Sequence, residues 1–249
     1  MKVLAIIGSA RKKETFNACS QVARRIREQE PSLQWENVIL SERGINQCNG
    51  CWSCFEKGEH TCPFYEDIND IWTGMKDADG IVLASPVYAM QVSAWMKVFI
   101  DRSASLFHRP SFHKPAIVIS ATAGGGLGPT IKYLRFAARG WGMRCVGDVG
   151  IKMRKRDADA AYRDQLDRRI SALADALLHA MKNDDAMKPS FSDLLQFSYM
   201  KRVAPFIKYD MDHWREQGWL ERGWYTDVRP NQTKAAIADW IVGMLFNHI

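Results

Sequence analysis

The chain has 249 residues, of which 47% are hydrophobic and 25% are charged. These values exclude a disordered, collagen-like or low-complexity chain, and the length suits one α/β domain with an appendage. The formal net charge of +6 is too small to imply nucleic-acid binding by itself. No apolar run approaches the ~20 residues that a membrane-spanning helix needs.

The N-terminus is predicted to be a buried strand rather than a signal peptide. Its apolar run covers only residues 3–7, and the basic Arg11-Lys12-Lys13 follows soon after. A signal peptide has its positive charges before a longer apolar stretch. A cytoplasmic protein is therefore expected.

Short apolar runs then alternate with helical patterns as far as residue 182. Strands are expected at residues 3–7, 33–40, 80–84, 115–121 and 143–149. Helices are expected around residues 19–26, 67–75, 93–103 and 128–141, and a last one after a cap at Asp157. The strand at 80–84 is apolar without a break, as in a parallel sheet that helices cover on both faces. This alternation predicts an open, doubly wound parallel sheet.

A polar loop follows the first strand, from Gly8 to Asn17. Ligands of such sheets bind beyond the carboxyl ends of the strands, and a helix N-terminus offers free N–H groups to an anion. Ser9, Arg11 and Thr15 add donors that suit a phosphate. The motifs of nucleoside-triphosphate P-loops and of Rossmann dinucleotide sites are both missing. The alternative is a polar connection with an ordinary helix cap at Thr15.

Two later strands end in loops of complementary character. Residues 85–93 contain Pro86 with its fixed φ, the flat ring of Tyr88, and Ser93 as a cap for the next helix. Residues 122–128 contain four glycines, which permit close backbone approach to a planar ligand. Together the three loops suit flavin mononucleotide (FMN), with its phosphate at the first loop and its ring between the other two.

The same segments resemble a known family. Residues 8–13 resemble the Gly-Ser-Pro-Arg-Lys opening of the NADPH-dependent FMN reductase and iron–sulfur flavoprotein families, with Ala10 in place of the proline. Residues 85–88 with 93–102, and residues 122–126, resemble their second and third signatures. The resemblance covers roughly residues 1–150. It implies a flavodoxin-like five-stranded sheet of order 2-1-3-4-5, bound FMN, reduction by NADH or NADPH, and a homodimer or homotetramer.

The loops and the resemblance together predict the cofactor contacts. These are Ser9, Arg11, Thr15, Phe16, Asn17, Pro86, Val87, Tyr88, Ala89, Met90, Ala123, Gly124 and Gly125. No catalytic acid, base or nucleophile is expected, because the flavin carries out the hydride chemistry.

Four of the six cysteines lie close together in a loop at residues 45–64: Cys48, Cys51, Cys54 and Cys62. Three thiolates at successive two-residue gaps and a fourth further on suit a [4Fe–4S] cluster. The pattern also matches the compact motif of the iron–sulfur flavoproteins. Free or disulfide-forming thiols and a zinc site remain alternatives. Cys19 and Cys145 are expected to be inert core thiols.

The alternation of strands and helices stops near residue 184, which predicts a domain of residues 1–184 and a helical extension of residues 185–249. The extension holds four of the nine tryptophans, Trp214, Trp219, Trp224 and Trp240. These rings form either a small core of their own or a cover for the flavin of a neighbouring subunit.

The predicted function is an FMN-dependent NAD(P)H oxidoreductase that passes electrons to a quinone, a flavin or a protein acceptor. One alternative is a non-enzymatic electron carrier that is reduced by a ferredoxin-like partner. Another is a redox-sensing module that uses the same fold without FMN.

Overall fold

The structure, a computed structural model, describes residues 1–183 and 187–246. Its centre is a sheet whose parallel strands are ordered β2-β1-β3-β5-β6. The strands are β1 (Lys2–Ile7), β2 (Gln34–Ile39), β3 (Gly80–Tyr88), β5 (Pro115–Thr122) and β6 (Arg144–Lys152). The predicted parallel sheet and its strand order are therefore confirmed. An additional short strand, β4 (Gln91–Val92), pairs antiparallel with the end of β3.

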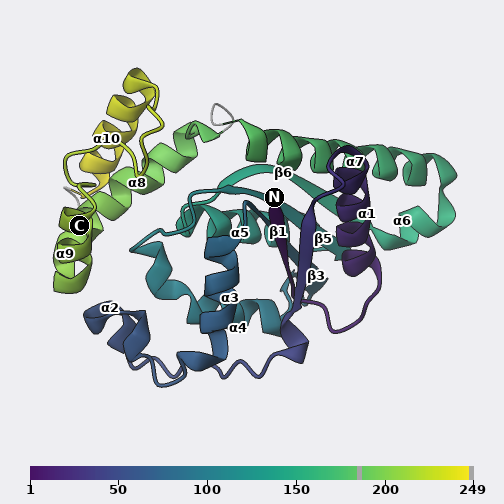
Figure 1. The fold of residues 1–249 in the computed structure, drawn as a ribbon, viewed down its shortest axis with the longest axis horizontal. Coiled ribbons are helices and arrows are strands. Elements are labelled where there is room, and N and C mark those ends of the chain that lie inside the picture. Colours follow the sequence, from purple (N-terminus) through teal and green to yellow (C-terminus); the bar gives the residue numbers. More distant parts are fainter. Residues whose placement is uncertain (184–186, 247–249) are drawn as a thin grey trace.

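Helices cover both faces of the sheet (Figure 1). The helices α1 (Glu14–Gln29) and α7 (Ala160–Lys182) pack on one face with Val3, Ala5 and Ile7. The other face contacts α3 (Glu66–Asp77), α4 (Ala94–Arg102) and α5 (Leu127–Gly140) through Leu4 and Ile6. Both faces are apolar because successive side chains of a strand point to opposite sides.

The predicted cap of the long helix α7 is wrong by two residues. A short helix, α6 (Met153–Ala158), precedes α7 and contains Asp157. The chain is extended at Asp159, whose side chain accepts a hydrogen bond from the backbone N–H of Tyr162 at 3.0 Å. Asp159 is the cap because its extended backbone lets the carboxylate reach an otherwise free N–H of the first turn.

The C-terminal region consists of α8 (Phe191–Val203), the 3-10 turn η5 (Ala204–Phe206), α9 (Lys208–Glu216) and α10 (Gln232–Phe246). It has a small core of its own around Trp214 and Trp219, which are 0% and 4% exposed. Trp240, by contrast, is 64% exposed. The predicted boundary at residue 184 lies outside the described residues, and the division into two domains stays a prediction.

This region contacts the central domain through ion pairs and through stacked rings. The carboxylate of Asp193 in α8 accepts hydrogen bonds from Arg139 at 2.7 Å and from Arg144 at 3.5 Å. The ring of His113 is stacked on Tyr225, with centroids 5.5 Å apart. Burial lowers the pKa of His113 to about 4, so this ring is neutral at pH 7.

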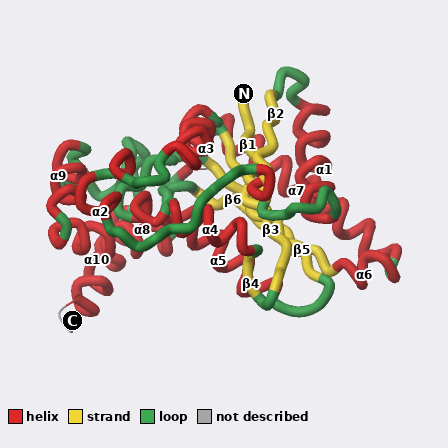
Figure 2. Tube along the Cα trace, turned by 90° about the horizontal axis from the view of Figure 1, so that it is seen from below, coloured by secondary structure: helices red, strands yellow, loops and turns green. Residues whose placement is uncertain are grey.

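The cysteine loop, residues 45–64, leads from η1 (Leu40–Glu42) to α3. It contains two short helical pieces, α2 (Ser53–Lys57) and η2 (Glu59–Thr61). In both orientations α2 lies beside α9 of the C-terminal region (Figures 1 and 2). The loop therefore lies between the sheet domain and the C-terminal helices.

Candidate functional site

The loop after β1, residues 8–13, lies directly against the start of α4. A Cβ atom added to Gly8 would be 2.7 Å from the hydroxyl oxygen of Ser93 and 2.8 Å from Cβ of Met96. A side chain does not fit there, which explains the glycine. Ser93 caps α4 as predicted, accepting a hydrogen bond from the N–H of Met96 at 3.3 Å.

The helix after this loop begins without a side-chain cap. Its N-cap residue is Lys13, not Thr15, and no side chain accepts from the first N–H groups. Those N–H groups point out of the helix and, together with the helix dipole, favour an anion. The Ser9 hydroxyl donates to the carbonyl of Arg11 at 2.8 Å and stabilises the loop.

Four more of the predicted contacts surround this helix start. Thr15 is buried, whereas Arg11 and Asn17 are exposed. Phe16 packs partly against the apolar core beneath the sheet. The structure thus leaves Arg11 and Asn17 free to face solvent or a ligand, while Phe16 mainly supports the fold.

A carboxylate at this helix start is neutralised by a basic residue. Glu14 lies 3.5 Å from Arg156 of α6, measured between carboxylate oxygen and guanidinium nitrogen. Glu14, Asn17 and Arg156 line a cavity of about 200 Å³. The pairing with Arg156 reduces the repulsion that Glu14 would exert on a phosphate.

The loop after β3 ends in a tight turn with unusual backbone. Tyr88 pairs with Gln91 across the β3–β4 ladder, so Ala89 and Met90 are the two central residues of the turn. Their φ values are +47° and +67°, which are costly for residues other than glycine. Tyr88 and Met90 are 40% and 60% exposed. An exposed, strained turn at the edge of a sheet is typical of a ligand contact.

The loop after β5 packs against this turn. At Gly126, with φ of +82°, an added Cβ would lie 2.7 Å from Cα of Met90 and 2.8 Å from the Cγ1 of Val87. Gly124 has no neighbour within 4 Å of an added Cβ. Ala123, Gly124 and Gly125 are all exposed. The loop therefore presents bare backbone next to the strained turn.

The structure thus brings the three predicted loops to one edge of the sheet. The ends of β3 and β5 and the short β4 lie together there (Figure 2). The first loop contacts the segment around Ser93, and the third contacts Val87 and Met90. An uncapped helix start, an exposed turn and bare backbone therefore lie at the same edge of the sheet. The individual flavin contacts stay predictions.

The four loop cysteines differ in exposure. Cys48 and Cys51 are exposed, and Cys54 and Cys62 are partly buried. Burial raises the pKa of the Cys54 thiol, and the nearby Cys62 and Cys48 raise it further. Within residues 1–183 and 187–246, however, no three His, Cys, Asp or Glu side chains are grouped as metal ligands.

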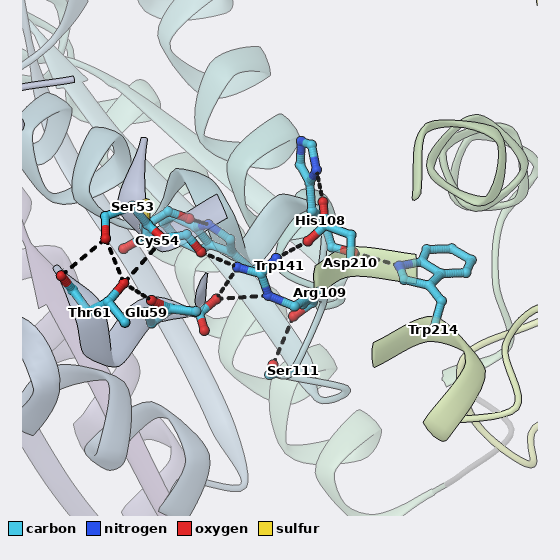
Figure 3. A network of polar contacts seen from close by, with 12 residues as sticks. Ser53, Cys54, Glu59, Thr61, His108, Arg109, Ser111, Trp141, Asp210 and Trp214 are labelled. Atoms are coloured by element: carbon cyan, nitrogen blue, oxygen red, sulfur yellow. Dashed lines mark hydrogen bonds and ion pairs between the residues drawn. The ribbon is translucent and has the colours of Figure 1, made fainter. Parts of the chain in front are cut away.

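Two buried arginines, Arg102 and Arg109, hold the cysteine loop, and only Arg109 lies outside the segments that resemble the family signatures. Arg102, at the end of α4, donates to the carbonyls of Asn46 at 2.9 Å and Phe64 at 2.5 Å. It also donates to the sulfur of Cys62 at 3.5 Å. Arg109 donates to the carbonyl of Cys54 at 2.7 Å (Figure 3).

Helix α4 connects the two parts of the site. It begins beside Gly8 and ends at Arg102, eight residues after its first residue Ala94. A helix rises 1.5 Å per residue, so the loop after β1 and the cysteine loop lie roughly 12 Å apart along α4.

A model of the family described as NADPH-dependent FMN reductase matches residues 1–155. An iron–sulfur flavoprotein of Archaeoglobus fulgidus is 32% identical over 228 residues, which are 88% of this chain and 100% of that protein. The chain belongs to the NADPH-dependent FMN reductase family. The resemblance inferred from the three loop motifs is therefore confirmed.

Other comparisons agree with this family. An iron–sulfur flavoprotein of Methanosarcina thermophila is 28% identical over 198 residues, covering 74% of this chain and 100% of its own. A solved flavone reductase has a TM-score of 0.59 at 16% identity, covering 76% of this chain and 66% of its own. At that identity the likeness shows the fold alone. Across the described residues, no helix is both long and apolar enough to cross a membrane.

The cysteine loop offers four thiols, which are the ligand type that iron–sulfur groups take. All four thiols are free, Cys62 and Cys48 are close enough to Cys54 to raise its pKa, and the cationic Arg102 donates to the sulfur of Cys62. Such donors to a ligating sulfur are common around metal centres. Arg102 lies in the segment 93–102, but its contacts with the cysteine loop were not predicted, and Arg109 was not singled out at all. The sequence around an arginine gives no signal of its long-range partners.

The two isolated cysteines are core residues, as predicted. Cys19 and Cys145 are 0% and 6% exposed. Burial raises the pKa of Cys19 to about 12, so its thiol is protonated and unreactive at pH 7.

Proposed function

We propose that this member of the FMN reductase family is an FMN-dependent NAD(P)H oxidoreductase. The observation that carries the proposal is the convergence of the three strand-end loops, whose contacts run from Gly8 to Ser93 and from Met90 to Gly126. FMN, when bound, supplies the acceptance of a hydride from the nicotinamide and the onward transfer of its electrons. The acceptor is a quinone, a flavin or a protein.

The residues of this chain bind and orient the cofactor. We assign the phosphate to the uncapped start of α1, with Ser9, Arg11, Thr15 and Asn17 around it. The isoalloxazine ring then lies against the strained turn of residues 86–90 and the bare backbone of residues 123–125. The strain at Ala89 and Met90 supports this assignment, because it fixes the turn before the cofactor arrives.

We further propose that Cys48, Cys51, Cys54 and Cys62 hold a [4Fe–4S] cluster. The spacing of the four thiols and the donation from Arg102 to Cys62 support a cluster over zinc. The printed names of the relatives from A. fulgidus and M. thermophila point the same way. Free or disulfide-forming thiols are the competing outcome.

A second candidate is an electron carrier without nicotinamide activity, reduced by a ferredoxin-like partner. The observation that favours it is that the two relatives matched over their full length are named iron–sulfur flavoproteins rather than reductases. We expect a homodimer or homotetramer, since the flavin loops form an open edge. A reducing cytoplasmic location is also proposed, and the six free cysteines support it.

The test is the visible spectrum of anaerobically purified protein, with iron and sulfide assayed on the same sample. Flavin bands over a broad brown absorption, with about four iron atoms per chain, support both cofactors. Flavin bands without iron support the proposed reductase and refute the proposed cluster. Oxidation of NADH or NADPH by the same sample separates the enzyme from the carrier. A colourless protein that takes up no added FMN refutes the proposal.

A further inference from the structure

The cysteine loop cannot hold its own shape. Its helical pieces are the five-residue α2 and the three-residue η2, which are far below the length at which a helix is stable in isolation. Contacts from elsewhere in the chain must therefore fix this loop, and they come from Arg102, from Arg109 and from α9.

Arg109 joins three separate segments with one guanidinium group (Figure 3). Its Nη2 donates to the carbonyl of Cys54 at 2.7 Å and to the carboxylate of Glu59 at 2.9 Å. Its Nη1 donates to the carboxylate of Asp210 in α9. The Arg109 side chain is 3% exposed and that of Asp210 is 0% exposed. The cation is thus buried and is compensated by two carboxylates, Glu59 of the cysteine loop and Asp210 of the C-terminal region.

The second oxygen of Asp210 fixes the orientation of this carboxylate. It lies 2.6 Å from Nδ1 of His108. Burial and the neighbouring Arg109 lower the pKa of His108 to about 4, so the neutral ring donates its Nδ1–H to Asp210. Both carboxylate oxygens are therefore engaged.

Two neighbours of Asp210 bring α9 close to the loop. A Cβ added to Gly58 would lie 2.5 Å from the hydroxyl oxygen of Tyr209. The indole N–H of Trp214 donates to the carbonyl of His108 at 2.7 Å. Together these contacts fix α9 against residues 54–59 and against the segment that carries Arg109.

We propose that α9 clamps the cysteine loop, and that Asp210 is a positioning residue that acts through Arg109 on Cys54. This gives the C-terminal region a role at the cysteine site rather than at the flavin loops. The clamp orients Cys54 whether its thiol binds a cluster, binds zinc or stays free, so it does not depend on the proposed cofactor.

The test compares Asp210→Asn with a matched control, Asp212→Asn. Asp212 lies on the same helix but is 39% exposed and pairs with Lys208 and Arg215 of α9. In metal-free protein, we expect maleimide to label Cys54 several-fold faster in Asp210→Asn than in the wild type or the control. In protein that holds iron, we expect chelator to reveal an iron affinity lower by about 10- to 100-fold, as for other outer-shell residues.

Two further variants separate positioning from general stability. Arg109→Lys keeps a cation beside Asp210 but cannot reach all three segments at once. We expect it to keep the thermal midpoint near that of the wild type and still expose Cys54. The double variant Arg109→Lys/Asp210→Asn should label no faster than the faster single variant, because both act along one path.

The proposal is overturned if Asp210→Asn labels Cys54 and retains iron like Asp212→Asn. It is also overturned if Arg109→Lys leaves the labelling of Cys54 unchanged, which decides the matter even where Asp210→Asn does not fold. A protein without iron contradicts the proposed cluster, while the labelling of Cys54 still decides the clamp.

Discussion

The contact between the second and third loops can be tested with one pair of glycine substitutions. Gly126 has φ of +82°, and its Cβ position lies 2.7 Å from Cα of Met90. That neighbour is backbone and cannot rotate away. Gly124, two residues earlier on the same loop, has open space within 4 Å and no positive φ.

The expected cost of Gly126→Ala has two parts. The left-handed backbone costs a residue with a Cβ about 1–2 kcal/mol. Pushing the turn at Met90 aside adds about 1–3 kcal/mol, as in other overpacked sites. The sum is roughly 2–5 kcal/mol of unfolding free energy. In a chain of this size, such a loss lowers the thermal midpoint by about 4 °C or more.

Gly124→Ala is the matched control for the stability measurement, and it also tests whether the third loop contacts FMN. Without bound FMN, it should be neutral or slightly stabilising, by about 0.4–1 kcal/mol, because alanine restricts the unfolded chain. With FMN, it should lower affinity, because the methyl group occupies space that we assign to the flavin ring. Thermal unfolding and fluorescence titration with FMN measure the two effects separately.

The two variants can refute two different arguments. A Gly126→Ala protein with the midpoint of the wild type contradicts the close contact between Met90 and the third loop. A Gly124→Ala protein that binds FMN as tightly as the wild type removes this loop from the flavin site. The first result concerns the fold, and the second concerns the ligand.

Three more predictions follow from single contacts. Arg156→Gln should weaken FMN binding about 3- to 10-fold, because it leaves Glu14 unpaired beside the proposed phosphate site. Adding Glu14→Gln to this variant should restore the affinity. Fluorescence titration with FMN measures both. Arg102→Met should lower the reduction potential of a centre bound at Cys62, because it removes a cation that donates to this sulfur and favours the more negative reduced state; an unchanged potential in a spectroelectrochemical titration contradicts this. His113 has a pKa lowered to about 4 by burial, so the unfolded chain binds its proton first as pH falls. Unfolding free energy should therefore decrease by about 1–3 kcal/mol between pH 6.5 and pH 4, and denaturant unfolding of His113→Phe should show a smaller decrease.

The sheet could be predicted from sequence because its strands carry a local signal. β5 is buried along its whole length and β3 along its first six residues, and both contain an unbroken apolar run, residues 115–119 and 81–84 respectively. The strand β4 and its turn gave no such signal. Two-residue hairpin turns usually contain Asn-Gly or Gly-Gly, and here the left-handed positions are occupied by Ala89 and Met90. Tertiary contact with Gly126, rather than local preference, stabilises this turn.

The cysteine site was predictable only in part for a similar reason. Four closely spaced cysteines indicate metal or redox chemistry from spacing alone. The residues that orient the cysteines carry no such signal, because Arg109 and Asp210 are 101 positions apart in the chain. Nothing near either residue in the sequence marks it as a partner of the other. Long-range ion pairs of this kind become visible only when the fold is known.

Helix α4 connects the loop after β1, which was predicted from sequence, with the contacts of the cysteine loop, which were not. Its first turn supports the flavin loop through Ser93 and Met96, and its last residue, Arg102, donates to Cys62. The separation of the two loops is therefore set by a nine-residue helix rather than by a flexible connection. Because the helix is rigid, a change in its length would move the cysteine loop relative to the loop after β1, and so would move the proposed cluster site relative to the proposed flavin site. The spacing of the two loops therefore depends on the number of residues between Ser93 and Arg102 as well as on which residues these are.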